Sequence, residues 1–298
     1  MTQKVYVFGD TGGHGLQLFK SLKEIGVDLE KRTIPEGVLI VHLGDLIHRG
    51  PLSNTIVGLV EDLILLNPGQ WLQVLGNHES QHLKQGISFW ACDCNRYMVD
   101  TIQGWYDSRT ARIAWALEDV VPQRWTDGNR PLGQEELIGS FLATHGGLTF
   151  PVWKNLGSPQ TATEAAELLV ENSDWAMQSV GEAMGMQRFG VVGPVWARAA
   201  GEAYNYWEIA ARKDGETMPF GQLIGHSAPF YFSKDTWYGN TSMEFRRNSK
   251  VLKDQLRTIA FVANSAIICM DPGYGEYLNP QEHPKQPYLR FEIEGATP

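Results

Sequence analysis

The sequence predicts an α/β fold in which parallel strands alternate with helices. Three observations predict it. Short β-branched runs alternate with helical patterns from the start of the chain, three strand-like runs end within the first 80 residues, and a polar residue follows each of these runs. With 298 residues, 43% of them hydrophobic, the chain is long enough to bury the core of such a fold.

The first part of the chain is expected to form successive strand and helix units. Strands are predicted at residues 4–8, 38–43 and 71–75, and amphipathic helices at 16–25 and 53–66. The second helix should end at Asn67, Pro68 and Gly69, because proline and glycine interrupt helices.

Residues 80–135 interrupt this alternation. They are rich in Trp, Arg and Asp, follow a mostly helical pattern and contain a predicted loop at 126–131, so they are interpreted as a helical cap or insertion. Further strands are expected at 137–144, 221–225, 258–263, 266–270 and 288–293, with a helical region at 161–179. No internal repeat or low-complexity linker is visible, so residues 1–298 are expected to form a single domain.

Charge and hydropathy exclude several classes of protein. The net charge is −9 and no Lys/Arg cluster exceeds a pair, which disfavours binding to nucleic acid or to anionic membranes. Apolar runs are strand-sized, far below the roughly 20 residues of a membrane span. The N-terminus lacks the apolar core of a signal peptide, so a cytoplasmic location is expected. The three cysteines are too few for a disulfide framework and are expected to be reduced.

Polar side chains follow the predicted strands at the points where these end. Asp10, Asp45 and Asn77 follow the first three strands, and His145 and His226 follow later ones, each before small residues. In open α/β sheets ligands bind outside the carboxyl ends of the strands, so these side chains should converge. Two carboxylates, an amide oxygen and imidazoles form a mixed set of ligands that suits Mn, Fe or Zn.

The order of these motifs resembles the calcineurin-like metallophosphoesterase superfamily. The motifs are Gly-Asp, Gly-Asp-x-x-x-Arg-Gly, Gly-Asn-His-Glu, His-Gly-Gly and Gly-His, and they span residues 9–226. The His-Gly-Gly-Leu that begins at His145 and the Arg-Gly at Arg49 are most similar to the phosphoprotein phosphatase and diadenosine tetraphosphatase branch. The resemblance implies a four-layer αββα sandwich with mixed β-sheets and a helical insertion.

The resemblance also implies a centre of two divalent metal ions, with Mn²⁺ expected first and Fe or Zn as alternatives. In it Asp45 would bridge the ions, Asp10 would bind the first, and Asn77, His145 and His226 would bind the second. Such ions, about 3.5–4 Å apart, can hold both the attacking and the leaving oxygen of an in-line displacement.

Three further residues complete the implied site. The resemblance makes His78 the general acid that protonates the leaving group rather than a ligand. A guanidinium group matches phosphate geometry, so Arg49 is the first choice for binding the substrate and Arg198 the second. The predicted reaction is hydrolysis of a phosphate ester by a metal-bound hydroxide.

The expected substrate is a phosphorylated protein or a small phosphate ester. A serine/threonine-phosphatase-like phosphomonoesterase is the first hypothesis. The alternative is a dinucleoside-polyphosphate hydrolase or another phosphodiesterase, because both share the metal centre and differ in loops.

Two positions depart from the family pattern. Gly12 stands where the family has a histidine ligand of the first metal, and we predict that His14 replaces it; a water ligand or a weakly held ion are the alternatives. His48 stands where the family has an aspartate that orients the general acid and raises its pKa. A protein that has lost activity through these changes and now only binds ligands is a third hypothesis.

Two other motifs compete with this interpretation. His78, Glu79 and His82 spell His-Glu-x-x-His, the zinc-peptidase motif, which requires a helix, whereas Gly76 and Asn77 place its first histidine on a loop. The glycine-rich loop at residues 9–15 resembles a phosphate-binding loop, but no Lys-Ser/Thr follows. Taken singly, Asp10 could also cap a helix and His145 could be a core histidine.

Overall fold

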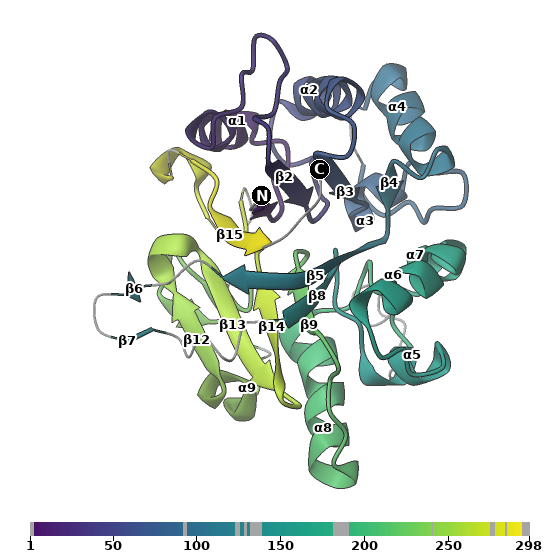
Figure 1. Ribbon diagram of the computed structural model, residues 1–298, viewed down its shortest axis with the longest axis vertical. Coiled ribbons are helices and arrows are strands. Elements are labelled where there is room, and N and C mark those ends of the chain that lie inside the picture. Colours follow the sequence, from purple (N-terminus) through teal and green to yellow (C-terminus); the bar gives the residue numbers. More distant parts are fainter. Residues whose placement is uncertain are drawn as a thin grey trace.

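The chain folds around one large mixed sheet flanked by helices (Figure 1). The computed structural model describes residues 3–91, 94–122, 126–127, 130–131, 139–180, 191–239, 241–274, 278–283 and 285–293. Within them the sheet consists of β1 (Gln3–Phe8), β2 (Val38–His42), β3 (Trp71–Val74), β4 (Ala111–Arg112), β5 (Ala114–Pro122), β8 (Gly139–Thr144), β9 (Gly221–Ile224), β12 (Ser249–Leu252), β13 (Arg257–Val262), β14 (Ser265–Cys269) and β15 (Tyr288–Ile293).

The described helices are α1 (Gly15–Glu24), α2 (Ser53–Leu66), α3 (Asn77–Ser80), α4 (Arg96–Asp107), α5 (Phe150–Asn155), α6 (Ala162–Glu171), α7 (Ser173–Gln178), α8 (Asn205–Asp214) and α9 (Met243–Arg247). A π-helix, η3, spans Ala199–Tyr204 and runs directly into α8. Small hairpins form from β6 (Thr126–Asp127) with β7 (Arg130–Pro131), and from β10 (Phe230–Tyr231) with β11 (Thr236–Trp237). In the described part of the chain, no helix combines the length and the apolar character needed to cross a bilayer.

The strand order is β12-β13-β14-β9-β8-β5-β15-β1-β2-β3-β4. β1, β2 and β3 are parallel, as the alternation of strands and helices predicts. β15 pairs antiparallel with β1, and β5 then joins β15 to β8 through a bulged pairing. The sheet therefore has two halves connected through β5.

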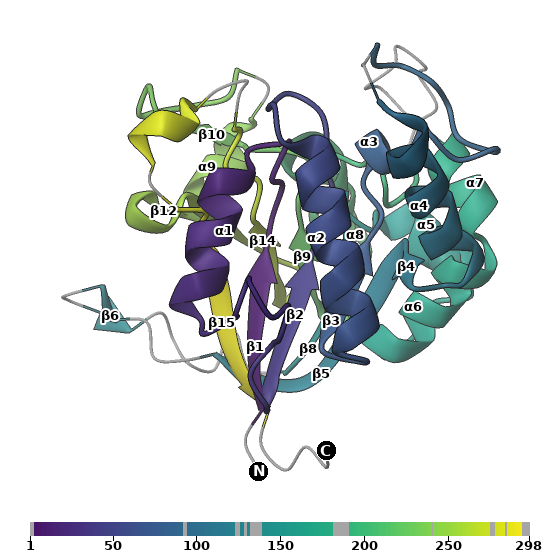
Figure 2. The ribbon, with the colours of Figure 1, turned by 90° about the horizontal axis from the view of Figure 1, so that it is seen from above.

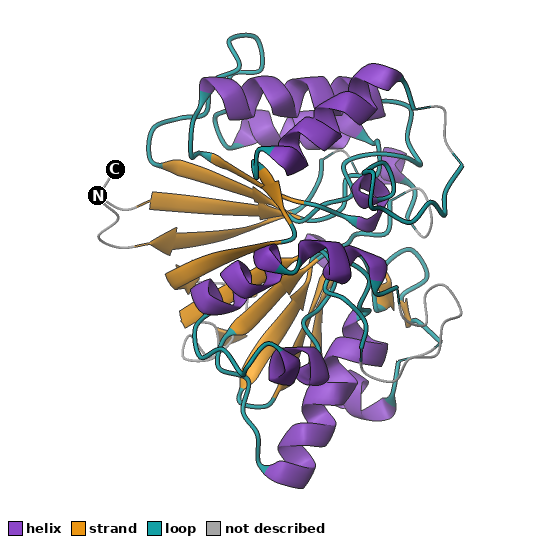
Figure 3. Ribbon diagram, turned by 90° about the vertical axis from the view of Figure 1, so that its right-hand side faces the viewer, coloured by secondary structure: helices purple, strands orange, loops and turns teal. Residues whose placement is uncertain are grey.

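Successive side chains of a strand point to opposite faces of the sheet, so each half of the sheet packs against apolar side chains on both faces. In β1, Val5 and Val7 pack in the core between the halves, whereas Tyr6 and Phe8 pack toward the helices. Figure 2 shows α1 and α2 covering β1 and β2, and Figure 3 shows two fans of strands with helices outside both. This arrangement confirms the predicted αββα sandwich.

Most predicted elements are found close to their expected bounds. The helix expected at 53–66 is α2, and the strand expected at 288–293 is β15. Among the described residues of 80–135, helical structure is confined to α4 and the first residue of the region, whereas Ala114–Pro122 is strand β5 of the main sheet. The pattern there was ambiguous because strand pairing over long sequence separation leaves little local signal. The single-domain division stays a prediction.

Candidate metal centre

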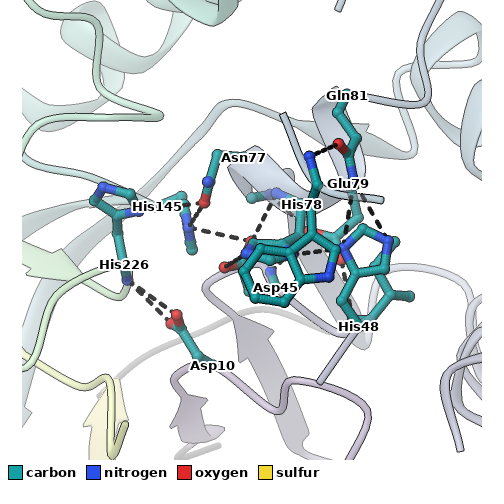
Figure 4. Close-up of polar contacts among 12 residues, drawn as sticks. Asp10, Asp45, His48, Asn77, His78, Glu79, Gln81, His145 and His226 are labelled. Atoms are coloured by element: carbon teal, nitrogen blue, oxygen red, sulfur yellow. Dashed lines mark hydrogen bonds and ion pairs between the residues drawn. The ribbon is translucent and has the colours of Figure 1, made fainter. Parts of the chain in front are cut away.

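Five strand ends meet at one edge of the sheet, as the sequence predicts. Asp10 follows β1, Asp45 follows β2, Asn77 follows β3, His145 follows β8 and His226 follows β9. Their side chains gather in one place in Figure 4. Ligand atoms of Asp10, Asp45 and His145 all lie within 4.8 Å of one another.

Asn77 and His145 are at the middle of this group. The Oδ1 atom of Asn77 lies 2.9 Å from Nε2 of His145 and 3.2 Å from Nδ1 of His226. The Nδ1 atom of His145 lies 2.8 Å from the carbonyl oxygen of Leu43, to which it donates a hydrogen bond. This bond orients the ring and directs Nε2 toward Asn77 and toward Oδ1 of Asp45, 3.2 Å away.

The charges of these residues fit divalent cations. Burial alone lowers the pKa of His145, but the negative charges of Asp45 and Asp10 outweigh it and raise the pKa to about 10. Burial, together with Asp271 and Asp45, raises the pKa of Asp10 well above its usual value. These buried oxygen and nitrogen atoms therefore form a set of ligands that suits a divalent metal ion.

The glycines of the motifs have a steric reason. A Cβ at Gly76 would lie 2.0 Å from Oδ1 of Asp45, and a Cβ at Gly225 would lie 2.2 Å from Oδ1 of Asp10. The backbone N–H of His226 donates to both carboxylate oxygens of Asp10, at 3.1 and 3.2 Å. Any other residue at either glycine would therefore displace a carboxylate of the centre.

Glu79 supports the loop that carries Asp45, a role that the sequence analysis missed. Its fully buried carboxylate accepts hydrogen bonds from the backbone N–H groups of Asp45 and Gly76, at 2.7 and 2.9 Å, and of Leu46 and Ile47, at 2.8 and 3.3 Å. His78 lies in α3 and not on a loop as expected, but α3 ends at Ser80, before His82. The peptidase alternative therefore lacks a helix that carries both histidines, and the carboxylate of Glu79 is not available as a base.

His78 lies buried beside the centre, with its two nitrogens in different surroundings. Nε2 is 3.9 Å from Oδ2 of Asp45, and Nδ1 is 2.5 Å from Nδ1 of His48. The ring centroids of Phe89 and Trp90 lie 5.1 and 5.2 Å from the centroid of the His78 ring. His48 therefore does occupy the position next to the predicted general acid, as an imidazole instead of a carboxylate.

Both predicted arginines line a cavity of about 590 Å³ that opens over the centre. The guanidinium carbon of Arg49 lies 5.2 Å from the centroid of the Trp90 ring. Arg198 immediately precedes the π-helix η3, and its backbone N–H donates to the carboxylate of Glu202 at 2.7 Å. π-Helical turns occur frequently at functional sites.

Gly12 and His14 are the two residues that bear on the missing histidine ligand of the first metal. Gly12 has φ +53°, and a Cβ there would lie 3.4 Å from Cδ of Arg49, so the side chain of Arg49 occupies the adjoining space. His14 precedes α1 and packs against Tyr274, with 6.1 Å between the ring centroids. Among the described residues, His14 is not in the group of ligand atoms formed by Asp10. Its role as a substitute ligand stays a prediction.

Asp271 is a further carboxylate at the site. It follows β14, which is parallel to β9, so its side chain reaches the same edge and lines the cavity. Its Oδ1 accepts a hydrogen bond from the N–H of Gly273 at 2.7 Å. Burial is the main cause that raises the pKa of Asp271 to about 6. An acidic residue directly after a strand was the signal that could have identified it.

The expectation of three reduced cysteines is wrong for Cys94, which is disulfide-bonded. Cys269 is free and buried in β14, as expected of a packing residue. Cysteine count indicates whether a disulfide framework is possible, but it does not exclude a single disulfide bond.

Comparisons with known proteins agree with the family resemblance. The family model for calcineurin-like phosphoesterases matches residues 3–191. No curated protein matches the sequence.

Phosphatases are among the solved structures that match this chain. A cold-active protein-tyrosine phosphatase of a psychrophilic Shewanella species has a TM-score of 0.50 and 18% identity, over 91% of this chain and 71% of that chain. A protein serine/threonine phosphatase of Saccharomyces cerevisiae has a TM-score of 0.46 and 13% identity, over 99% and 81%. A protein described as a putative diadenosine tetraphosphatase has a TM-score of 0.34 and 14% identity, over 91% and 83%.

The family match covers more than half of the chain and contains the first four strand-end motifs, from Asp10 to His145. The fifth, at His226, lies beyond the match but joins the same group of side chains. This chain therefore belongs to the calcineurin-like phosphoesterase family, whose members are metal-dependent hydrolases of phosphate esters.

Proposed function

We propose that this protein is a phosphomonoesterase of the kind that acts on phosphoserine or phosphothreonine, or on small phosphate esters, with two divalent ions, Mn²⁺ being the first candidate. One arrangement carries the proposal. Nε2 of His78 faces Asp45 at 3.9 Å, and Arg49 and Arg198 line the cavity above the same point. An acid and two guanidinium groups around a metal centre suit a terminal phosphoryl group.

The centre needs its cations to act. When bound, two divalent ions would neutralise the carboxylates, orient the phosphoryl oxygens and activate a water molecule. Asp45 is the residue proposed to bridge them, with Asp10 on the first ion and Asn77, His145 and His226 on the second.

His78 is proposed to give the leaving oxygen its proton. Its Nδ1 faces His48 at 2.5 Å, so only Nε2 remains directed toward the centre. Phe89 and Trp90 lie against the same ring and limit the access of water to it. The proton therefore belongs on Nε2 when the ester bond breaks.

Arg49 and Arg198 are proposed to hold the phosphate. They come from opposite halves of the sheet, Arg49 after β2 and Arg198 before the π-helix η3. Two guanidinium groups on different sides can bind two non-bridging oxygens at once, which favours a terminal phosphate over an internal diester.

A dinucleoside-polyphosphate hydrolase is the second candidate, and the walls of the cavity are the observation that favours it. Phe89, Trp90 and Trp196 line a space of about 590 Å³. Such a volume holds a ligand of nucleotide size, and aromatic rings are surfaces on which a base can stack.

The two candidates are separated by substrate. We would measure kcat/KM with p-nitrophenyl phosphate, bis-p-nitrophenyl phosphate, phosphoserine, phosphothreonine and phosphotyrosine peptides, and diadenosine tetraphosphate, with Mn²⁺, Fe²⁺ or Zn²⁺ added. Preference for monoesters supports the proposal, and preference for the dinucleotide or the diester selects the alternative. Bound metal without turnover of any substrate would contradict both and favour the hypothesis of a protein that only binds ligands.

A further inference from the structure

We propose that His48, His82 and Cys94 form a separate metal site beside the phosphoesterase centre, which takes a zinc-like divalent ion when Cys94 is reduced. These residues are the second group in the described part of the chain whose ligand atoms lie within 4.8 Å of one another. The inference does not rest on which ester the protein hydrolyses.

The three distances within the group match those of a tetrahedral zinc site. Nε2 of His48 and Nε2 of His82 are 3.0 Å apart, and Sγ of Cys94 is 3.4 Å from the first and 3.5 Å from the second. Zinc bonds of about 2.0–2.1 Å to nitrogen and about 2.3 Å to sulfur, at tetrahedral angles, separate two nitrogens by roughly 3.3 Å and a nitrogen from a sulfur by roughly 3.6 Å. One ion between the three atoms would therefore need only small shifts.

Each ligand comes from a different segment that is fixed independently. His48 lies between β2 and α2, and its backbone N–H donates to Oγ of Ser53 at 2.9 Å. His82 follows α3. Cys94 precedes α4, where Asn95 caps the helix by accepting a hydrogen bond from the N–H of Met98. His48 is buried, whereas His82 and Cys94 are half-buried, so an ion can reach the site from solvent.

The side chains of Gln81 and Trp90 hold the ring of His48 in place. The Oε1 atom of Gln81 accepts hydrogen bonds from the N–H groups of Phe89 and Trp90, at 3.2 and 2.9 Å, which fixes the orientation of the amide. Its nitrogen is 3.3 and 3.4 Å from the two ring nitrogens of His48 and 3.4 Å from Nε2 of His82. These are long contacts, which an ion bound to the two Nε2 atoms would displace. The Trp90 ring is nearly parallel to the His48 ring, with 6.5 Å between the ring centroids and 11° between the ring planes.

The oxidation state of Cys94 decides whether the site can form. Cys94 is disulfide-bonded in this structure, and a disulfide sulfur is not the thiolate that zinc binds. A thiol or phosphine reductant must supply two electrons to break the disulfide bond, and two protons then complete the two thiols. A thiol reductant becomes a disulfide in this step, and a phosphine becomes its oxide. The Cys94 thiol finally gives its proton to solvent as its sulfur binds the ion.

An ion bound to His48, His82 and Cys94 would affect the phosphoesterase centre through one hydrogen bond. A histidine that binds a metal through Nε2 carries its hydrogen on Nδ1 and donates it. The Nδ1 of His48 would donate to Nδ1 of His78, 2.5 Å away, and the hydrogen of His78 would then lie on Nε2, which faces Asp45. His48 is in this respect a positioning residue for His78.

The test uses Co²⁺ as a spectroscopic probe on the full-length protein. Protein reduced with a phosphine, which is then removed, is titrated with Co²⁺ beside untreated protein, and thiols are counted in both. We expect one more equivalent of Co²⁺ bound in the reduced protein and a near-ultraviolet thiolate-to-cobalt charge-transfer band. Asp10, Asp45, Asn77, His145 and His226 offer no sulfur, so the phosphoesterase centre cannot produce this band, whatever its activity.

Variants assign the band to its residues. Cys94→Ser and His82→Ala should lose the band and the extra equivalent, whereas Cys269→Ala, which removes the other described thiol, should keep both. Far-ultraviolet circular dichroism checks that the variants fold, and if one fails, the reduced and oxidised wild-type proteins still decide. The proposal is overturned if thiol counting shows Cys94 reduced and no band appears, or if Cys94→Ser retains it.

Discussion

The Nδ1 atoms of His48 and His78 lie 2.5 Å apart, so one of these two imidazoles donates a hydrogen bond to the other. Burial first, and then the neighbouring charges of His78 and His82, lower the pKa of His48 to about 3. His48 therefore stays neutral and orients His78 as an aspartate would, but supplies no negative charge.

Restoring that charge should make His78 a better acid at neutral pH. In His48→Asp, a carboxylate near His78 should raise the pKa of its imidazolium, because an opposite charge within a few ångströms favours the protonated ring. Aspartate tolerates the φ of +70° at this position better than most residues. We expect the alkaline limb of the kcat/KM profile to move to higher pH, and His48→Asn, equal in size and neutral, to leave it in place.

Removing the acid should separate catalysis from metal binding. His78→Asn is expected to lower turnover by ~10²–10⁴ while the metal content is retained, because the His78 side chain is predicted to be no ligand. The loss should be larger for alkyl phosphates than for p-nitrophenyl phosphate, whose leaving group needs less protonation. Metal analysis of the purified variant and the rates for both esters check this. Loss of metal would assign the side chain of His78 to the centre as a ligand.

Asp45→Asn should abolish turnover and release metal. Asp45 is the proposed bridge, it is 6% exposed, and the charges of His145 and His78 outweigh its burial and hold its pKa below the usual range. Metal content by mass spectrometry and p-nitrophenyl phosphate turnover measure the effect. Asp254→Asn, in the short 3₁₀ helix Lys253–Gln255 and exposed, removes the same charge and should change neither metal content nor turnover.

Asp271 should destabilise the metal-free protein above pH 6. Its pKa is raised to about 6 in the folded chain, so the folded state holds its proton more tightly, and this stability is lost as pH rises through about 6. In chelator, Asp271→Asn should therefore raise the free energy of unfolding at pH 8 by up to about 3 kcal/mol, with a smaller gain at pH 5. Asparagine can still accept the hydrogen bond from Gly273. An equal gain at both pH values in urea unfolding would refute the electrostatic cause.

Gly76→Ala should disrupt the centre through a single methyl group. Its Cβ would lie 2.0 Å from Oδ1 of Asp45, so the carboxylate or the loop must move, and metal binding and turnover should both fall. The matched control is Gly104→Ala in α4, where a Cβ meets nothing within 4 Å. There the same change should stabilise the protein by roughly 0.5–1 kcal/mol, because alanine is the better helix former. Thermal unfolding and metal analysis of both variants test the pair.

Local pattern was sufficient for the strands that lead into the candidate centre and for the residues that follow them, but not for strand β5. Each of Asp10, Asp45, Asn77, His145 and His226 directly follows a run that reads as a strand, and the carboxyl ends of parallel strands meet at one edge. Their convergence could therefore be predicted without knowing the path of the chain between them, although their roles as ligands stay predictions.

The sequence by itself determined the α/β fold, the family resemblance and the strand-end residues of the candidate centre, because these depend on periodicity and on order along the chain. Only the tertiary structure decided that Asp271 lines the same cavity as Asp10, that Glu79 holds the loop of Asp45, and that His48 contacts both His78 and Cys94. It also placed His14 apart from the other candidates, against Tyr274. The physical reason is that such contacts join segments far apart in the chain, and their distances follow from how the helices and both halves of the sheet pack, which no local pattern encodes.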